Sequence, residues 1–175
     1  MNKVALQWGV IGGISLLIFS LILYISGMEI YTNWLIQMLS FVIVIVFMIV
    51  GGLKVRAANG GFLSYQSSFI AVFTIAAVAM LIMTVFNIIL YNFINPELGS
   101  IVKEISIEKA IEMMEGFGMA ESDIQKSIEE MENMDKQFTV GGQLIQYGKG
   151  LIFWAIASAL FALIPRKNNP QVETN

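Results

Sequence analysis

Hydrophobic residues fall into four long blocks, at residues 4–25, 35–53, 69–93 and 144–164, separated by polar segments. The first block has no charged residue, and as a helix it rises about 33 Å, enough to cross a hydrocarbon core of about 30 Å. The second is rich in β-branched residues, but a single segment that crosses lipid must satisfy its own backbone as a helix. The pattern predicts an all-α polytopic membrane protein, one membrane domain over residues 1–175 with four transmembrane helices.

The first block could instead be a cleaved signal peptide. Its apolar run is longer than the roughly 7–15 residues of a signal core, its positive start is only Lys3 and the amino terminus, and no small-residue cleavage site follows it. These features favour a retained helix.

The segment between the third and fourth blocks predicts an extramembrane amphipathic helical hairpin over residues 97–140. We expect a first helix at about residues 100–115, ended by Gly116 and Gly118, and a second that starts at Ser122 with a capping box. The second helix has one apolar face, formed by Ile124, Ile128, Met131, Met134 and Phe138. This face could close against the first helix, bind a protein partner or lie on lipid, and its acidic surroundings disfavour lipid.

Charge is distributed unevenly along the chain. Hydrophobic residues make up 57% of the chain and charged residues 13%, whereas soluble domains hold about 25% charged residues. Residues 97–135 hold eleven acids and three bases, and the remainder holds two acids and seven bases. Because this acidic segment would repel phosphates, we expect no nucleic-acid partner.

The residue types also exclude several kinds of chemistry. The chain has no cysteine and no histidine, so it has no thiolate nucleophile, histidine base, or thiolate or imidazole metal ligand. None of the apolar blocks contains Asp or Glu, which argues against a proton- or cation-coupled transporter. We therefore expect a protein that is not an enzyme, with no catalytic residue, metal site or cofactor.

Basic residues near the block ends predict the orientation. Lys and Arg gather on the cytoplasmic side of membrane proteins, and here they precede the first block, follow the second and follow the fourth: Lys3, Lys54, Arg56, Arg166 and Lys167. Both termini are therefore expected in the cytoplasm and residues 94–143 outside it, where lysines are less dense. Tyr31, Trp34 and Tyr91 would then lie at the outer interface, which aromatic residues favour.

Small residues indicate where helices approach closely. Gly9 and Gly13 form a GxxxG motif in the first block, and Ala155 and Ala159 repeat the spacing in the fourth. This pattern predicts helix packing at these positions, with a contact between the first and fourth helices.

A few polar residues within the blocks are candidate functional residues. Lys149 is the only charged one, and its long stem could carry the ammonium group to the outer headgroups or let it contact an anion or substrate. Four neutral amides could form hydrogen bonds between helices or line a path: Gln7, Gln37, Asn87 and Gln146.

Several segments resemble the DUF4199 family. They are the start of the chain with Lys3, Gly9 and Gly13, and residues 51–56, 61–69 and 118–125; one departure is Gln66, where family members often carry an acid. The resemblance implies bacterial integral membrane proteins of unknown function with four helices, and therefore the bacterial inner membrane. It implies no catalytic residues.

Together these features favour a non-enzymatic membrane module or adaptor. Its expected partners are membrane lipid and either a protein that contacts the acidic outer hairpin or a second copy in a homo-oligomer. The alternative is a small transporter or permeation component in which Lys149 and the four amides line a path.

Overall fold

The computed structural model describes residues 2–132 and 134–169. Four helices are long and apolar enough to cross a membrane: α1 (Lys3–Ile25), α3 (Trp34–Ala58), α4 (Tyr65–Ile89, continued by the π-helical turn η1, Leu90–Ile94) and α8 (Val140–Phe161). Shorter helices connect them: α2 (Met28–Tyr31), α5 (Leu98–Gly116), α6 (Glu121–Glu132) and α7 (Asp135–Phe138). The described residues form no strand beyond one isolated bridge, which confirms the predicted all-helical fold with four candidate spans.

Helix ends differ from the limits of the apolar blocks because capping side chains set them. The expected fourth span starts at residue 144, but α8 begins at Val140, where the Thr139 hydroxyl accepts a hydrogen bond from the Gly142 N–H at 3.1 Å. Ser64 caps the start of α4 in the same way. Hydropathy marks only the part of a helix that lies in lipid, so these first turns carry no apolar signal.

The capping box expected at Ser122 is wrong. The helix α6 starts at Glu121, so Ser122 is already its second residue. The Ala120 carbonyl accepts hydrogen bonds from the N–H groups of Asp123 and Ile124, which places the entry to the helix two residues before Ser122.

The helix α4 occupies the centre of the molecule and contacts α1, α3 and α8. A Cβ atom added at Gly9 of α1 would lie 2.8 Å from the Val78 Cβ, and one at Gly13 would lie 2.6 Å from the Ile82 Cδ1. The glycines of α1 therefore face α4, the third span, and not α8, the fourth span, against which the sequence had placed them. The physical reason is the set of small buried residues that lets α4 approach its neighbours: Ser68, Ala71, Ala76 and Ala79.

The outward faces of the long helices are apolar. Ile18 of α1, Val42 of α3 and Ile156 of α8 are 51%, 53% and 66% exposed. Such a surface is costly in water and is expected where lipid is the solvent.

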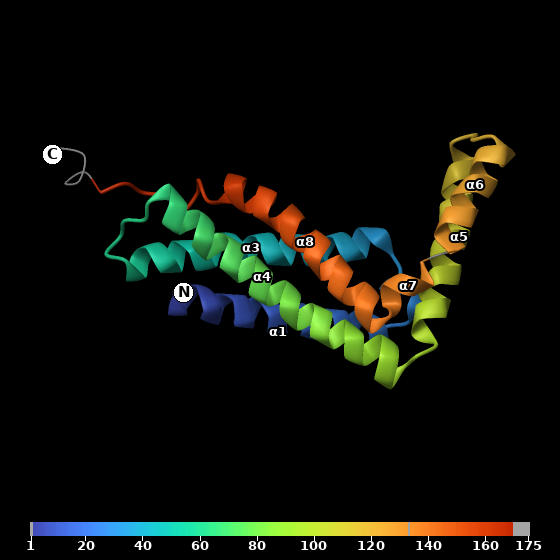
Figure 1. Cartoon of the computed structure of the whole chain (residues 1–175), viewed down its shortest axis with the longest axis horizontal. Helices are drawn as coiled ribbons and strands as arrows, with labels where there is room; N and C mark the ends of the chain where they lie inside the picture. Colours follow the sequence, from blue (N-terminus) through green and yellow to red (C-terminus); the bar gives the residue numbers. More distant parts are fainter. Residues whose placement is uncertain (1, 133, 170–175) are drawn as a thin grey trace.

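Figure 1 shows the start of α1, the α3–α4 connection and the end of α8 at one end of the long helices, and α5 and α6 at the other. Hydroxyls of α4 complete the end of α8, since Tyr65 donates to the Ala159 carbonyl at 3.0 Å and Ser68 to the Ala162 carbonyl at 2.6 Å. This end also carries the basic residues expected on the cytoplasmic side.

Candidate functional site

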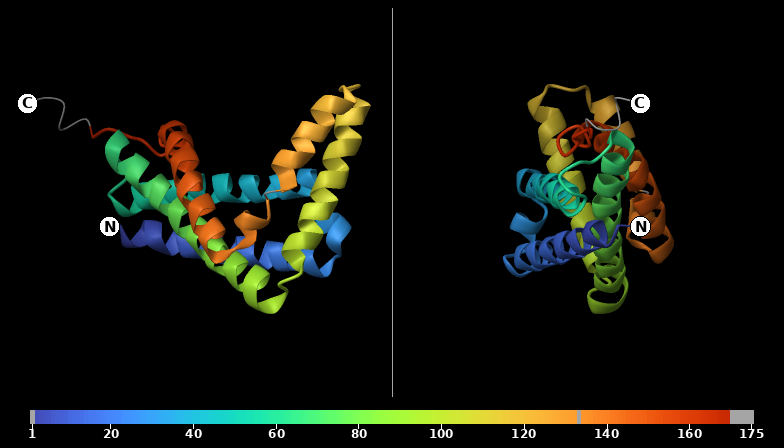
Figure 2. Two further views of the ribbon diagram at one scale, coloured as in Figure 1. Left: turned by 45° about the vertical axis from the view of Figure 1, so that its right-hand side comes forward. Right: turned by 90° about the vertical axis from the view of Figure 1, so that its left-hand side faces the viewer.

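Two helices project from the end opposite the termini. Figure 2 shows α5 and α6 side by side, directed away from the long helices and joined by a turn at residues 117–120. We refer to residues 98–132 as the acidic arm.

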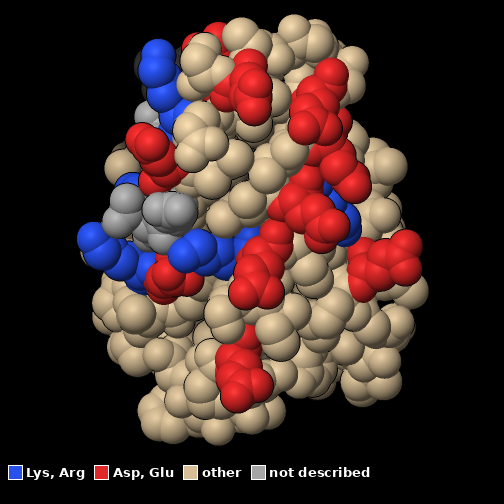
Figure 3. Space-filling view, turned by 90° about the vertical axis from the view of Figure 1, so that its right-hand side faces the viewer, with Lys and Arg blue, Asp and Glu red and all other residues tan. Residues whose placement is uncertain are grey.

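Acidic side chains cover the arm and its base. Of the eleven acids in residues 97–135, nine have described side chains, and all nine are exposed: Glu97, Glu104, Glu108, Glu112, Glu115, Glu121, Asp123, Glu129 and Asp135. The side chains of Glu130 and Glu132 lie outside the described residues. Figure 3 looks at this end of the molecule and shows acids spread over it. The resulting negative potential attracts cationic surfaces and repels anionic ones.

The apolar face of α6 is turned towards α5. Ile124 is 9% exposed and so is Met114 of α5, and Ile128, Met131 and Met134 are partly buried. Phe138 of α7 lies further along, with its ring centroid 4.9 Å from that of Tyr91. The face predicted from the sequence is therefore used inside the molecule, and the free surface of the arm is a different one.

The tip of the arm carries apolar side chains among the acids. Met113, Phe117 and Met119 are 59%, 79% and 43% exposed. Gly118, with φ of +70°, turns the chain there and leaves the Phe117 ring outside. Exposed aromatic and methionine side chains that are surrounded by charged residues are typical of protein interaction sites.

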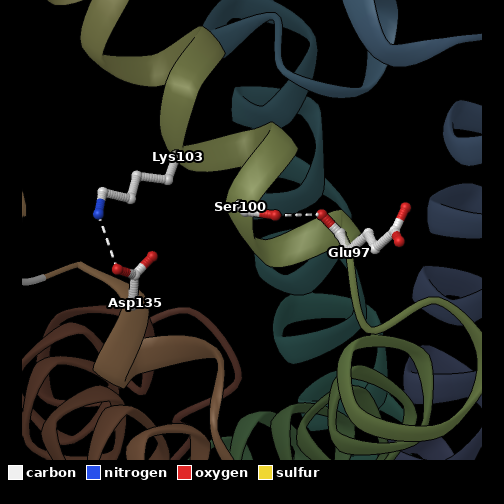
Figure 4. Close-up of polar contacts among 4 residues, drawn as sticks. All are labelled: Glu97, Ser100, Lys103 and Asp135. Atoms are coloured by element: carbon white, nitrogen blue, oxygen red, sulfur yellow. Dashed lines mark hydrogen bonds and ion pairs between the residues drawn. The ribbon is translucent and has the colours of Figure 1, made fainter.

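Three polar contacts hold the base of the arm. Lys103 of α5 donates to the Asp135 carboxylate at 2.7 Å, and in Figure 4 the Glu97 carboxylate points away from this pair. Lys109 donates to the Thr32 hydroxyl at 2.9 Å, which links α5 to the α2–α3 connection. Asn92 donates to the Phe138 carbonyl at 3.1 Å. Two of the lysines within the acidic segment are thus used to attach the arm.

Beneath the base of the arm is a hollow of about 550 Å³, which we call the outer chamber. It lies among the ends of α1, α3 and α4 that are nearest the arm, with α5 across it, and eight of its thirteen lining residues carry a hydroxyl, amide or phenol group. Its polar lining residues are Ser20, Tyr31, Thr32, Gln37, Ser40, Asn87, Tyr91 and Ser106, and the others are Trp34, Met38, Phe41, Met83 and Val102.

A pair of phenols closes the chamber between α2 and η1. The hydroxyls of Tyr31 and Tyr91 lie 2.9 Å apart, and Gln37 donates to the Tyr31 carbonyl at 2.6 Å. Burial raises the pKa of the Tyr31 phenol, while its hydrogen bonds to Tyr91 and Ser20 act in the opposite direction. Tyr31 is therefore a neutral hydrogen-bonding group at physiological pH.

The other candidate polar residues lie away from the chamber. Lys149 is exposed in the third turn of α8, and with Gln146 it lines a separate hollow of about 510 Å³ beside α7. Gln7 is exposed on α1 near the end that holds the termini. Of the four amides, only Gln37 and Asn87 lie in the same hollow. Ala155 and Ala159 are partly buried on α8.

Sequence reasoning placed Tyr31 and Tyr91 at the interface but missed their pairing. The two residues are 60 positions apart, and a one-turn helix and a π-helical turn present them. The available signal was that both phenols stand at outer ends of predicted spans. Asn92, which joins α4 to α7, carried no signal of its own because an Asn near a helix end is common.

One family model matches this chain. The model, described as a protein of unknown function (DUF4199), matches residues 7–167. No curated protein and no solved structure matches the chain.

Proposed function

The chain belongs to the DUF4199 family, as its sequence resemblance indicated, and from this premise we propose that it is a non-enzymatic membrane adaptor whose acidic arm binds a protein partner. In this proposal the four long helices form a bundle in the bacterial inner membrane. Both termini are cytoplasmic, and α5 and α6 form the hairpin outside. The basic residues at the end with the termini support this orientation.

The proposal rests on one observation: apolar side chains are exposed at the tip of the acidic arm. Phe117 is 79% exposed although its neighbours in sequence include Met114, which is 9% exposed within the arm. An exposed apolar group among acids is suited to a partner surface that is both basic and apolar.

A second copy is disfavoured as the occupant of the tip. Two arms of the same chain would bring like charges together, because Glu112, Glu115 and Glu121 of each copy are exposed near the same apolar groups. A partner with Lys or Arg around an apolar pocket meets no such repulsion.

The transport alternative has less support. A path requires polar groups that follow one another across the membrane, but Gln37 and Asn87 line the outer chamber, Gln146 and Lys149 line a different hollow, and Gln7 faces outward at the other end. The adaptor therefore remains our proposal.

Site-specific photocrosslinking in cells tests the proposal. A photoreactive residue at Phe117 should give an adduct with one defined protein, and replacing Glu112 and Glu115 by Gln should reduce that adduct several-fold. The matched control places the same residue at Ile156, which is 66% exposed on α8. No adduct at Phe117, the same adduct at Ile156, or an adduct of two copies of the chain would contradict the proposal.

A further inference from the structure

The outer chamber has the dimensions and polarity of a ligand site. Its volume of about 550 Å³ falls within the range of about 300–1,000 Å³ that small-molecule sites occupy. Tyr91, one of its lining residues, is presented by the π-helical turn η1, and π-helical turns are often found at functional sites.

Some of the polar side chains that line the chamber have no hydrogen-bond partner among the described residues. Asn87 and Ser40 line it, and their side chains have no hydrogen-bond partner among the described residues. Gln37 uses its amide N–H on the Tyr31 carbonyl, and its carbonyl oxygen accepts no hydrogen bond from a described residue. These three side chains are only partly buried, and polar groups at membrane depth need hydrogen-bond partners, so the chamber suits an occupant that both donates and accepts hydrogen bonds, or accepts several.

The part of an occupant that lies inside the chamber carries no net charge. None of the residues that line the chamber is acidic or basic, among those that the structure describes. A charged group in this place would lose hydration without gaining an opposite charge. The nearest cation in the hydrogen-bond network is Lys109, whose ammonium group lies 2.9 Å from the Thr32 hydroxyl at the edge of the chamber.

The open edge of the chamber is apolar, and it faces lipid if α3 crosses the membrane as the proposed function has it. Trp34, Met38 and Phe41 line the chamber and are also 65%, 52% and 47% exposed, and their spacing places them along one stripe of α3. Val102 and Ser106 of α5 lie across the aqueous side. An occupant that enters past this apolar stripe has an apolar tail that can lie along it.

We propose that the outer chamber binds a membrane glycerolipid, with the glycerol ester groups among Asn87, Ser40, Gln37 and the Tyr31–Tyr91 pair, and an acyl chain along Trp34, Met38 and Phe41. Ester carbonyls accept hydrogen bonds from the amide and hydroxyl groups. Where the lipid carries a phosphate, that group lies outside the chamber on the side of Lys109.

Lipid retention by the purified full-length chain tests this site. The chain is delipidated in mild detergent, incubated with dioleoylglycerol, dioleoylphosphatidylethanolamine or dioleoylphosphatidylglycerol, and weighed by native mass spectrometry. Asn87→Leu and Ser40→Leu should each lower the amount of retained lipid about fivefold, because each removes one hydrogen bond. In Ser40→Leu the larger side chain also fills part of the chamber. The control, Gln7→Leu, removes an exposed amide of α1 and should leave retention unchanged.

The three lipids distinguish the sources of the ligand. Equal retention of all three lipids supports recognition of the ester backbone alone. If the chain prefers the phosphate-bearing lipids and Lys109→Met abolishes this preference, the result supports the same site with a phosphate at its edge. Helical content measured by circular dichroism confirms that each variant is folded. Retention that neither chamber variant lowers, or that Gln7→Leu lowers equally, would overturn the proposal and leave water as the occupant.

Discussion

Replacing Gly13 by alanine should weaken the packing of α1 on α4. The added Cβ would lie 2.6 Å from the Ile82 Cδ1, 2.9 Å from the Ile82 Cβ and 3.2 Å from the Ala79 Cα. A rotamer change can move the Ile82 Cδ1 but not its Cβ, so the helices must also move apart, and overpacking of this kind costs about 1–3 kcal/mol. The free energy of unfolding in mixed detergent micelles, followed by circular dichroism, should fall by that amount.

The matched control is Gly148→Ala on α8. A Cβ there meets nothing within 4 Å, so the change should be neutral or stabilising by up to about 1 kcal/mol through helix propensity. In the background of Ile82→Ala, the change Gly13→Ala should cost less than in the unmodified chain, because the Cδ1 atom at 2.6 Å is gone. Equal effects of Gly13→Ala and Gly148→Ala would refute the assigned contact between α1 and α4.

Three further predictions concern the outer end. Asn92→Leu should destabilise the base of the arm by about 1–3 kcal/mol, because the Phe138 carbonyl loses its donor, and should speed limited proteolysis within the arm; an unchanged rate would contradict this. Asp135→Asn should lower the free energy of unfolding by less than about 1 kcal/mol, since Asp135 is 60% exposed and solvent screens its ion pair with Lys103. A larger decrease in the free energy of unfolding would contradict this screening. The pKa of Tyr31 is raised above its ordinary value of 10, so the folded chain keeps this proton after the unfolded chain has lost it. Stability should therefore fall as the pH rises above 10, and less steeply in Tyr31→Phe than in the unmodified chain; equal slopes would contradict a buried phenol.

The sequence was informative wherever lipid determines the pattern. Apolar blocks of sufficient length predicted four spans, because a segment in hydrocarbon must be both apolar and helical. The limits of the helices were less accurate, since Thr139 and Ser64 set them through single hydrogen bonds in polar sequence.

Helix neighbours could not be derived from local spacing. The GxxxG motif of Gly9 and Gly13 indicates a close approach, but it does not specify the partner helix. The partner depends on which other helix offers small residues at the same depth, and both α1 and α8 pack on α4. A motif on one helix contains no information about that three-helix arrangement.

The site was only partly predictable for the same reason. Gln37 and Asn87 were candidates as polar residues within apolar blocks, and they do lie in one hollow. Lys149 met the same criterion but lies elsewhere, because this part of α8 packs beside α7. The exposed tip of the arm was not foreseen, since nothing in the spacing of Met113, Phe117 and Met119 distinguishes an exposed turn from a buried one.

The membrane orientation of the arm is tested most directly by labelling single cysteines, and the chain has no native cysteine to interfere. Phe117→Cys at the tip of the arm and Ala58→Cys at the end of α3 both place the thiol at an exposed position. With a membrane-impermeant maleimide applied from the periplasmic side, we predict labelling of Phe117→Cys before permeabilisation and of Ala58→Cys only after it. Labelling of Ala58→Cys first, or of both positions from the same side, would contradict an acidic arm held on the side of the membrane opposite the termini.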